Sequence, residues 1–173
     1  MSKQLSWSLL AVWAMGLLVA LLVYGQRQLS EFDPEGKLQY HSTSPQFDER
    51  LTAVLKAQQI KSGSIIHIGT QQTCFCENLT EPHQTQLVEK FRSMAFELVK
   101  LDIEEIPELG RILSTVPALM IVDKQYRLRY VGPYATGYGC FTGKNLVEQV
   151  TGYAQMSPYQ GAVIKADAVG CFC

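Results

Sequence analysis

Four of the chain's five cysteines lie in two identical tripeptides. The 173-residue sequence carries Cys74-Phe75-Cys76 near its middle and ends on Cys171-Phe172-Cys173, with Cys140 between them in a glycine-rich stretch. Thiolates attack disulfides and bind soft metal ions, so paired cysteines can support either kind of chemistry. The odd cysteine count leaves at least one thiol without an intramolecular partner, which argues against a purely structural disulfide framework.

The first Cys-Phe-Cys stands between an apolar run and a helical pattern. Residues 64–69 (SIIHIG) predict a short buried strand, and the residues after Cys76 carry apolar side chains at helical spacing. The start of a helix stabilises an anion, because its backbone N–H groups are unpaired and its dipole is positive there. We therefore expect Cys74 to be the more exposed, attacking thiol and Cys76 to resolve the mixed disulfide.

Only Phe75 separates these two cysteines. A disulfide closed across one residue forms a small, strained ring, and strained disulfides are easily reduced. If Cys74 and Cys76 pair with each other, we expect an oxidising or isomerising site and not a strong reductant.

The terminal Cys-Phe-Cys suggests two ways in which both cysteine pairs could act together. The run GAVIKADAV at 161–169 favours an added strand or an arm that delivers Cys171 and Cys173 to Cys74 and Cys76. The two pairs then either exchange disulfides, as a relay between substrate and redox partner, or hold Cu(I) or Zn(II) through four thiolates. The sequence leaves both uses open, together with the disulfide connectivity.

The elements that must position these cysteines alternate between strand and helix. An amphipathic helix is expected over 46–60, and a second over 77–94, where the early Pro82 implies a kink or a delayed start. The other predicted elements are strands at 96–103, 118–122 and 127–131, helices at 104–114 and 144–155, and a loop at 132–143. The order βαβαββα, after one extra helix, predicts a single α/β domain.

An uncharged apolar stretch, Leu5–Tyr24, precedes the domain and has about the ~20 residues that a membrane-spanning helix needs. It exceeds the usual apolar core of a signal peptide, and bulky Tyr24 precedes the only small residue at the cleavage position, so an uncleaved anchor over 1–25 is favoured. The polar residues 26–45 predict a tether.

Compartment and partner class follow from cysteine content and charge. Cysteine-rich tracts behind a membrane segment fit an oxidising compartment, which in a Gram-negative bacterium is the periplasmic face of the inner membrane. Net charge is −1 and no basic cluster is present, so the electrostatic footprint of a nucleic-acid binder is missing.

Residues 64–155 resemble the thioredoxin-like superfamily, specifically its membrane-tethered thiol-disulfide oxidoreductases. The resemblance rests on the cysteines between strand and helix, on Pro82 inside that helix, and on Thr115-Val116-Pro117 before ALMIVDKQYRLRYVG. It implies a central mixed sheet flanked by helices over 46–156, followed by a cysteine-bearing tail over 157–173. It also implies that Pro117 is cis and faces the redox pair, with Cys140 in a neighbouring loop.

The leading hypothesis is exchange with protein thiols or disulfides and with a redox partner protein, without a cofactor. Its catalytic residues are Cys74, Cys76 and Pro117, and its auxiliary thiols are Cys140, Cys171 and Cys173. The alternative is a metal-binding or metal-delivery protein whose Cu(I) or Zn ligands are Cys74, Cys76, Cys171 and Cys173. A third possibility, supported by the altered cysteine spacing, is a redox-inactive binding module.

The three histidines are expected to be structural or solvated. His67 falls inside an apolar strand and is expected to be a satisfied core residue, whereas His41 and His83 are expected to face solvent.

Overall fold

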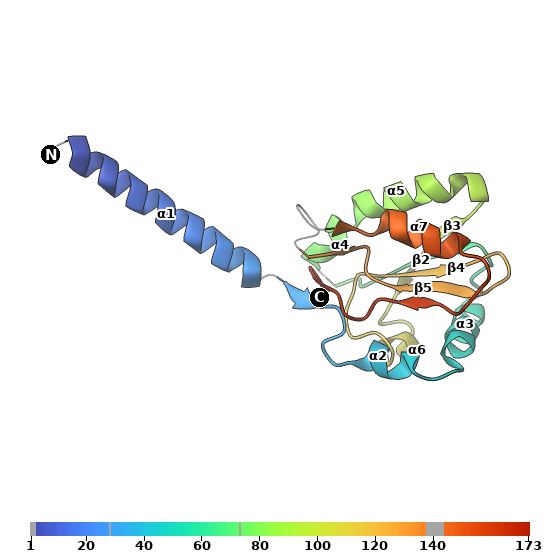
Figure 1. The fold of residues 1–173 in the computed structure, drawn as a ribbon. Helices are drawn as coiled ribbons and strands as arrows, with labels where there is room; N and C mark the ends of the chain where they lie inside the picture. The colour runs from blue at the N-terminus through green and yellow to red at the C-terminus, as the bar shows by residue number, and fades with distance from the viewer. Residues whose placement is uncertain (1–2, 28, 73, 138–143) are drawn as a thin grey trace.

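The computed structural model describes residues 3–27, 29–72, 74–137 and 144–173 (Figure 1). A five-stranded mixed sheet forms the centre, in the order β3-β2-β4-β5-β8. β2 is parallel to β3 and antiparallel to β4, β4 is antiparallel to β5, and β8 is parallel to β5. The strands are β2 (Ser64–Gly69), β3 (Glu97–Asp102), β4 (Ala118–Val122), β5 (Leu128–Gly132) and β8 (Val163–Ile164). The predicted mixed α/β architecture is confirmed and is compatible with a thioredoxin-like fold.

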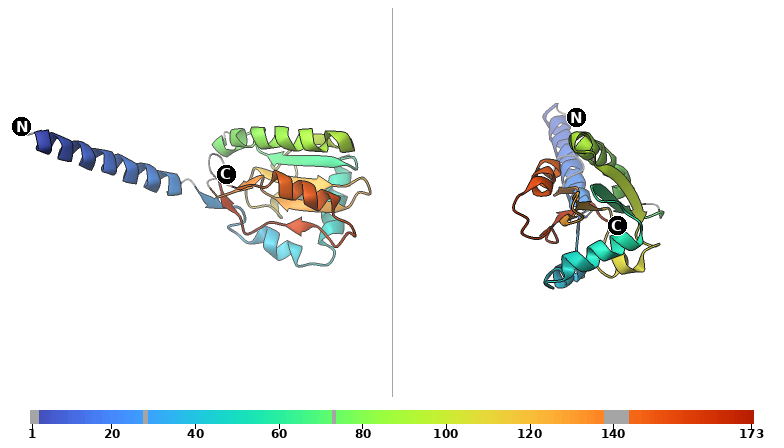
Figure 2. Two further views of the ribbon diagram at one scale, coloured as in Figure 1. Left: turned by 45° about the horizontal axis from the view of Figure 1, so that its top comes forward. Right: turned by 90° about the vertical axis from the view of Figure 1, so that its right-hand side faces the viewer.

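Helices cover both faces of this sheet (Figure 1 and Figure 2). One face carries α5 (Glu81–Phe91) and α7 (Val147–Gln155), and the other carries α3 (Phe47–Ala57) and the short α6 (Pro107–Gly110). Neighbouring strand residues point to opposite faces, so Ile65 joins the core under α5 and α7 while Ile66 joins the core over α3. Both faces of β2 and β4 are therefore buried, as their continuous apolar sequences predict.

The segment expected to be a tether is partly folded. It forms β1 (Ser30–Glu31) and α2 (Lys37–Ser42), and it buries Phe32 and Leu38 in the core. These two apolar residues are isolated among polar neighbours, so no periodic pattern marks them. Tertiary contacts order this segment although its local sequence does not.

Two predicted helices differ in extent from those in the structure. Residues 77–94 are divided into α4 (Phe75–Leu79), α5 and the 3₁₀ turn η1 (Arg92–Met94), with Pro82 in the first turn of α5. The delayed start implied by this proline is confirmed, because proline is tolerated where a helix N–H has no partner. The helix expected over 104–114 is reduced to α6, which begins at Pro107.

The hairpin between β4 and β5 turns without glycine. Tyr126 adopts a positive φ of 62°, and its hydroxyl donates a hydrogen bond to the Ile60 carbonyl at 2.6 Å. Asp123 accepts hydrogen bonds from the backbone N–H groups of Gln125 and Arg127, both at 2.9 Å. An aspartate that bonds its own turn replaces the glycine that such turns usually contain.

The last residues form two short strands rather than one. β8 extends the central sheet, and β9 (Val169–Gly170) pairs antiparallel with β1. The loop after β5 holds β6 (Ala135–Thr136), which pairs with β7 (Lys144–Asn145). Both expected forms of the tail, a strand and an arm laid over the domain, therefore occur.

The N-terminal helix α1 (Lys3–Arg27) is long and apolar enough to cross a membrane over Gln4–Gly25. None of this stretch is buried against the domain. The predicted apolar N-terminal helix is confirmed at this level.

Candidate functional site

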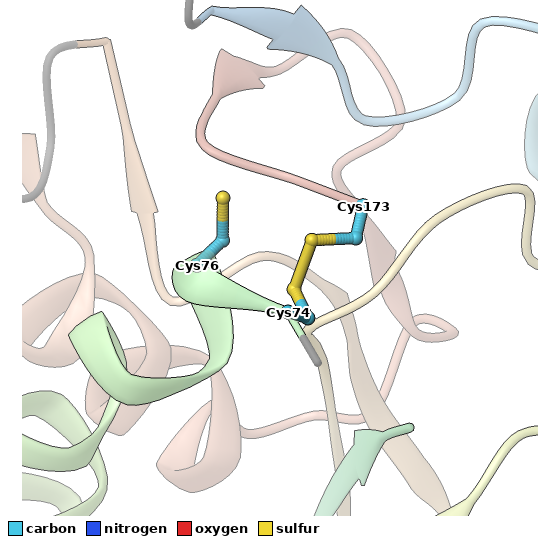
Figure 3. Close-up of side chains that lie close together, drawn as sticks. All are labelled: Cys74, Cys76 and Cys173. Carbon is cyan, nitrogen blue, oxygen red and sulfur yellow. A yellow bond between two sulfur atoms is a disulfide. The ribbon is translucent and has the colours of Figure 1, made fainter. Parts of the chain in front are cut away.

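Two disulfides join the two Cys-Phe-Cys tripeptides. Cys74 is bonded to Cys173 and Cys76 to Cys171, across sequence separations of 99 and 95 residues. The structure thus brings together all four cysteines that the sequence singled out in pairs, and Figure 3 shows Cys173 beside the start of α4.

Of the connectivities that the sequence left open, the structure has the one in which Cys74 and Cys76 are bonded to the tail and not to each other. Neither residue is prominently exposed. Cys74 is 6% exposed and Cys76 is 8% exposed, so the expectation that Cys74 is the accessible thiol was wrong for this oxidised state. The reason is the tail, which offers partners at Cα–Cα distances of 6.2 and 5.4 Å, within the usual span of a disulfide. Pairing with the tail avoids the small ring of a Cys-X-Cys disulfide.

Local structure fixes the two internal cysteines. β2 ends at Gly69, and Cys74 is the N-cap residue of α4 with an extended backbone. Its carbonyl oxygen accepts a hydrogen bond from the Glu77 N–H at 3.2 Å. Cys76 follows in the first turn and points inward, whereas Phe75 between them is 68% exposed.

The tail is held beside these cysteines by non-covalent contacts as well. The Cys173 N–H donates to the Val116 carbonyl at 2.8 Å, and the Val116 N–H donates to the Cys173 carbonyl at 3.1 Å. One position earlier, the Phe172 ring packs edge-on against buried Phe32, with ring centroids 5.1 Å apart. The β1–β9 pairing holds the residues that precede Cys171.

A cis peptide bond joins Val116 to Pro117, as the resemblance implies. Pro117 lies between the tail and α4, where it lines a small cavity of about 30 Å³ together with Cys76 and Cys171. On the other side, a groove of about 240 Å³ is bordered by Cys74, Val116 and Cys173. Because Cys173 is exposed and Cys171 is half-buried, we call the Cys74–Cys173 disulfide the outer one and the Cys76–Cys171 disulfide the inner one.

A buried polar network lies behind α4. His67 of β2 is 2% exposed, and its Nε2 contacts the Glu77 carboxylate, which directly follows Cys76 in the chain. The His67 Nδ1 lies 2.9 Å from the Tyr134 hydroxyl and 3.2 Å from the Gln84 amide nitrogen. The prediction that His67 is a satisfied core residue is confirmed, but its link to Glu77 and Tyr134 was missed.

Burial controls the charge of this network. It lowers the pKa of His67 below the usual value, although the Glu77 carboxylate opposes this effect. Burial, with the nearby Glu77 charge, also raises the pKa of Tyr134 well above its ordinary value. A neutral imidazole can accept a proton at one nitrogen while donating at the other, so the network can hold or move a proton beside the inner disulfide.

The amino-acid signature of DUF6436, a domain of unknown function, matches residues 43–173. The chain belongs to the DUF6436 family. No curated protein and no solved structure matches the sequence. The DUF6436 match includes both Cys-Phe-Cys tripeptides, Pro117 and the His67 network, whereas Phe32 and β1, which hold the tail, precede the matched residues.

Three cysteine sulfurs of the DUF6436 domain lie close together. The Sγ atoms of Cys74, Cys76 and Cys173 all lie within 4.8 Å of one another (Figure 3). Cys140, expected as an auxiliary thiol, lies outside the described residues. His83, expected to face solvent, is half-buried and lines the cavity beside Cys76.

Proposed function

We propose that this DUF6436 protein is a membrane-anchored thiol-disulfide exchange protein of the thioredoxin-like type, with its domain on the extracytoplasmic side. The observation that carries the proposal is the pair of disulfides between α4 and the tail, beside the cis Val116–Pro117 bond. Two adjacent disulfides can each accept two electrons from a dithiol. Their substrates are protein thiols, and a separate redox partner restores the starting state.

The outer disulfide reacts first. Cys173 is exposed while Cys74 is buried, so an incoming substrate thiolate attacks the Cys173 sulfur, breaks the bond to Cys74 and releases Cys74 as a thiolate. The second thiolate of the substrate then attacks the substrate sulfur that is bonded to Cys173, and Cys173 leaves as a thiolate. The substrate leaves as a disulfide, and Cys74 and Cys173 remain reduced.

The inner disulfide can then replace the outer one. The Cys74 sulfur lies within 4.8 Å of the Cys76 sulfur, so the Cys74 thiolate can attack Cys76, form a transient Cys74–Cys76 disulfide and release the Cys171 thiolate. The Cys173 thiolate then attacks Cys74 and releases the Cys76 thiolate, which restores the outer disulfide and leaves Cys76 and Cys171 reduced. One disulfide moves and no net electrons are gained or lost. Glu77, which follows Cys76 in the chain, and His67, whose ring contacts the Glu77 carboxylate, provide an acceptor for a thiol proton. The reverse sequence reduces a substrate disulfide.

The sheet order, the cysteines at the start of α4 and the cis proline support the thioredoxin-like assignment. The apolar helix α1 and the disulfides support a location at the outer face of a membrane, where disulfides persist. Only residues 28 and 29 separate α1 from β1, and an extended chain advances about ~3.5 Å per residue. Since β9 pairs with β1, this short link supports a site close to the membrane surface.

Alkylation trapping tests the proposal. The full chain is incubated with a reduced dithiol peptide, quenched with acid, alkylated and analysed by mass spectrometry. Transfer of the Cys74–Cys173 disulfide to the peptide is expected before loss of the Cys76–Cys171 disulfide. Matched variants, Cys173→Ser and Cys171→Ser, separate the two, because only the first should abolish the early phase. Disulfides that persist unchanged in excess dithiol would overturn the proposal.

A further inference from the structure

Reduction of both disulfides frees four thiols, three of which lie close together. The Cys74, Cys76 and Cys173 sulfurs are all within 4.8 Å of one another, whereas the Cys171 sulfur adjoins that of Cys76 but does not join this mutual group. Thiolates bridged by a metal ion approach one another to a similar distance, because metal–sulfur bonds are about ~2.3 Å long. We propose that the reduced protein binds one Cu(I) ion through these three thiolates.

The tail does not depend on its disulfides to stay in place. Cys173 is fixed to Val116 by two backbone hydrogen bonds, and Gly170 pairs with Ser30 in the β1–β9 ladder. The Phe172 ring remains packed against Phe32. These contacts contain no sulfur, so they persist when the S–S bonds open. The three thiols are thus held together before any metal arrives, which reduces the ordering that metal binding must otherwise drive.

The donor set and its surroundings select a soft ion. Thiolate ligands favour Cu(I) and zinc, whereas Mg²⁺ and Ca²⁺ need oxygen ligands. Structural zinc almost always takes four tetrahedral ligands, while three converging thiolates satisfy Cu(I). The carboxylate that follows Cys76, Glu77, is engaged by His67, and Glu104, which borders the groove beside Cys74 and Cys173, accepts a hydrogen bond from the Thr70 hydroxyl. Cys74 and Cys76 are buried, whereas Cys173 is exposed and leaves one side of the site open to an incoming ion.

Metal binding and disulfide formation exclude each other. Each disulfide takes two electrons and two protons from an external dithiol, whose own sulfurs become a disulfide. The Cu(I) ion then replaces the protons of three thiols and changes no oxidation state. The same sulfurs cannot form disulfides while they bind copper, so the redox state of the tail determines whether the site exists. The metal site does not require exchange activity toward other proteins.

Anaerobic titration of the full chain in detergent with Cu(I) alone, against a chromogenic Cu(I) chelator, tests the proposal. All proteins carry Cys140→Ser so that this thiol adds no ligand. The reduced protein should bind one Cu(I) per chain and the oxidised protein none. Cys173→Ser should lower the affinity sharply, whereas Cys171→Ser should change it by less than threefold. Equal losses in the two variants, or no loss in either, would overturn the three-thiolate site.

A matched pair of phenylalanine variants tests whether the tail is positioned in advance. Phe172→Ala removes the contact with Phe32 and should weaken Cu(I) binding about tenfold, the low end for residues that support metal ligands. Phe75→Ala, which changes the exposed phenylalanine of the other tripeptide, should have no effect. Circular dichroism verifies that each variant is folded. Unchanged affinity in folded Phe172→Ala, or tighter binding of Zn(II) than of Cu(I), would contradict the proposal.

Discussion

His67 belongs both to the buried core of the sheet and to the candidate site, through its contact with Glu77. His67 contributes to the centre of the sheet, yet its ring reaches the carboxylate that follows Cys76. Glu77 Oε2 is buried and has no hydrogen-bond partner among the described residues. Buried polar atoms are usually bonded, and an exception often has a functional reason. This acceptor lies beside Gly69 at the end of β2, one residue along the chain from Cys76.

The charge of His67 makes stability depend on pH. Its pKa in the folded state lies below the unfolded value of about ~6.5, so the unfolded chain binds more protons in the window below that pH. The free energy of unfolding should therefore fall as pH falls from 7 to 5, by at most about 1.4 kcal/mol per pH unit for one proton. Urea denaturation of the full chain at several pH values measures this slope. His67→Gln should flatten it, and an unaltered slope in that variant would assign the effect elsewhere.

The Asp123–Arg129 ion pair should be a larger contributor to stability than any exposed pair. Both side chains are buried, and the Arg129 Nε donates to Asp123 Oδ2 at 2.7 Å. Asp123→Ala leaves the buried Arg129 guanidinium without its carboxylate and with only the Met156 carbonyl, at 2.8 Å, so the free energy of unfolding should fall by about 3–5 kcal/mol. Asp167→Ala breaks the exposed pair with Lys165 and should cost less than about 1 kcal/mol. Urea denaturation compares the two, and similar losses would contradict the argument.

Among the secondary-structure elements, α4 and the C-terminal tail are joined by two disulfides. Its two disulfides close nearly the same loop, since they span 99 and 95 residues. A second crosslink beside the first therefore closes only a few additional residues. Either bond alone therefore gives most of the stabilisation from closing the long loop, although the Cys74–Cys173 bond is the more exposed to solvent.

This redundancy predicts strongly non-additive variants. Replacing Cys74 and Cys173 by alanine, or Cys76 and Cys171 by alanine, should each lower the free energy of unfolding by about 2 kcal/mol, the entropy of a very short loop. Replacing all four should lower it by more than about 5 kcal/mol, because the long loop then opens as well. Guanidinium denaturation measures these losses. If the two double variants account for the full loss of the quadruple variant, the loops are not nested in the folded chain.

Two strands of the central sheet, β2 and β4, were predictable because their apolar runs are nearly continuous and need no distant partner to be recognised. SIIHIG and ALMIV became β2 and β4 with the predicted bounds. The segments that complete the site were not predictable in the same way. β1 and β9 have two residues each and are defined only by each other. The contact of His67 with Glu77 likewise depends on the path of the chain from β2 into α4, which no local spacing encodes.

In the whole molecule, the connection between α1 and the domain is short and leads directly to the candidate site. The chain passes from α1 into β1 within three residues, and β1 holds the strand that precedes Cys171. The same short segment thus connects the apolar helix to the cysteine-bearing tail. If α1 spans a membrane as proposed, a domain attached in this way is expected to lie close to the bilayer.

Orientation across the membrane decides whether the disulfides meet an oxidising compartment. Cysteine scanning of the full chain in bacterial cells tests it, with all five native cysteines replaced by serine and one new cysteine introduced. Tyr40→Cys, at a position that is 74% exposed, should react with a membrane-impermeant maleimide in intact cells whose outer membrane has been permeabilised. Ser2→Cys, on the other side of the apolar stretch, should react only after lysis. The reverse pattern would put the domain in the cytosol, where thiols are kept reduced, and would exclude a persistent disulfide relay.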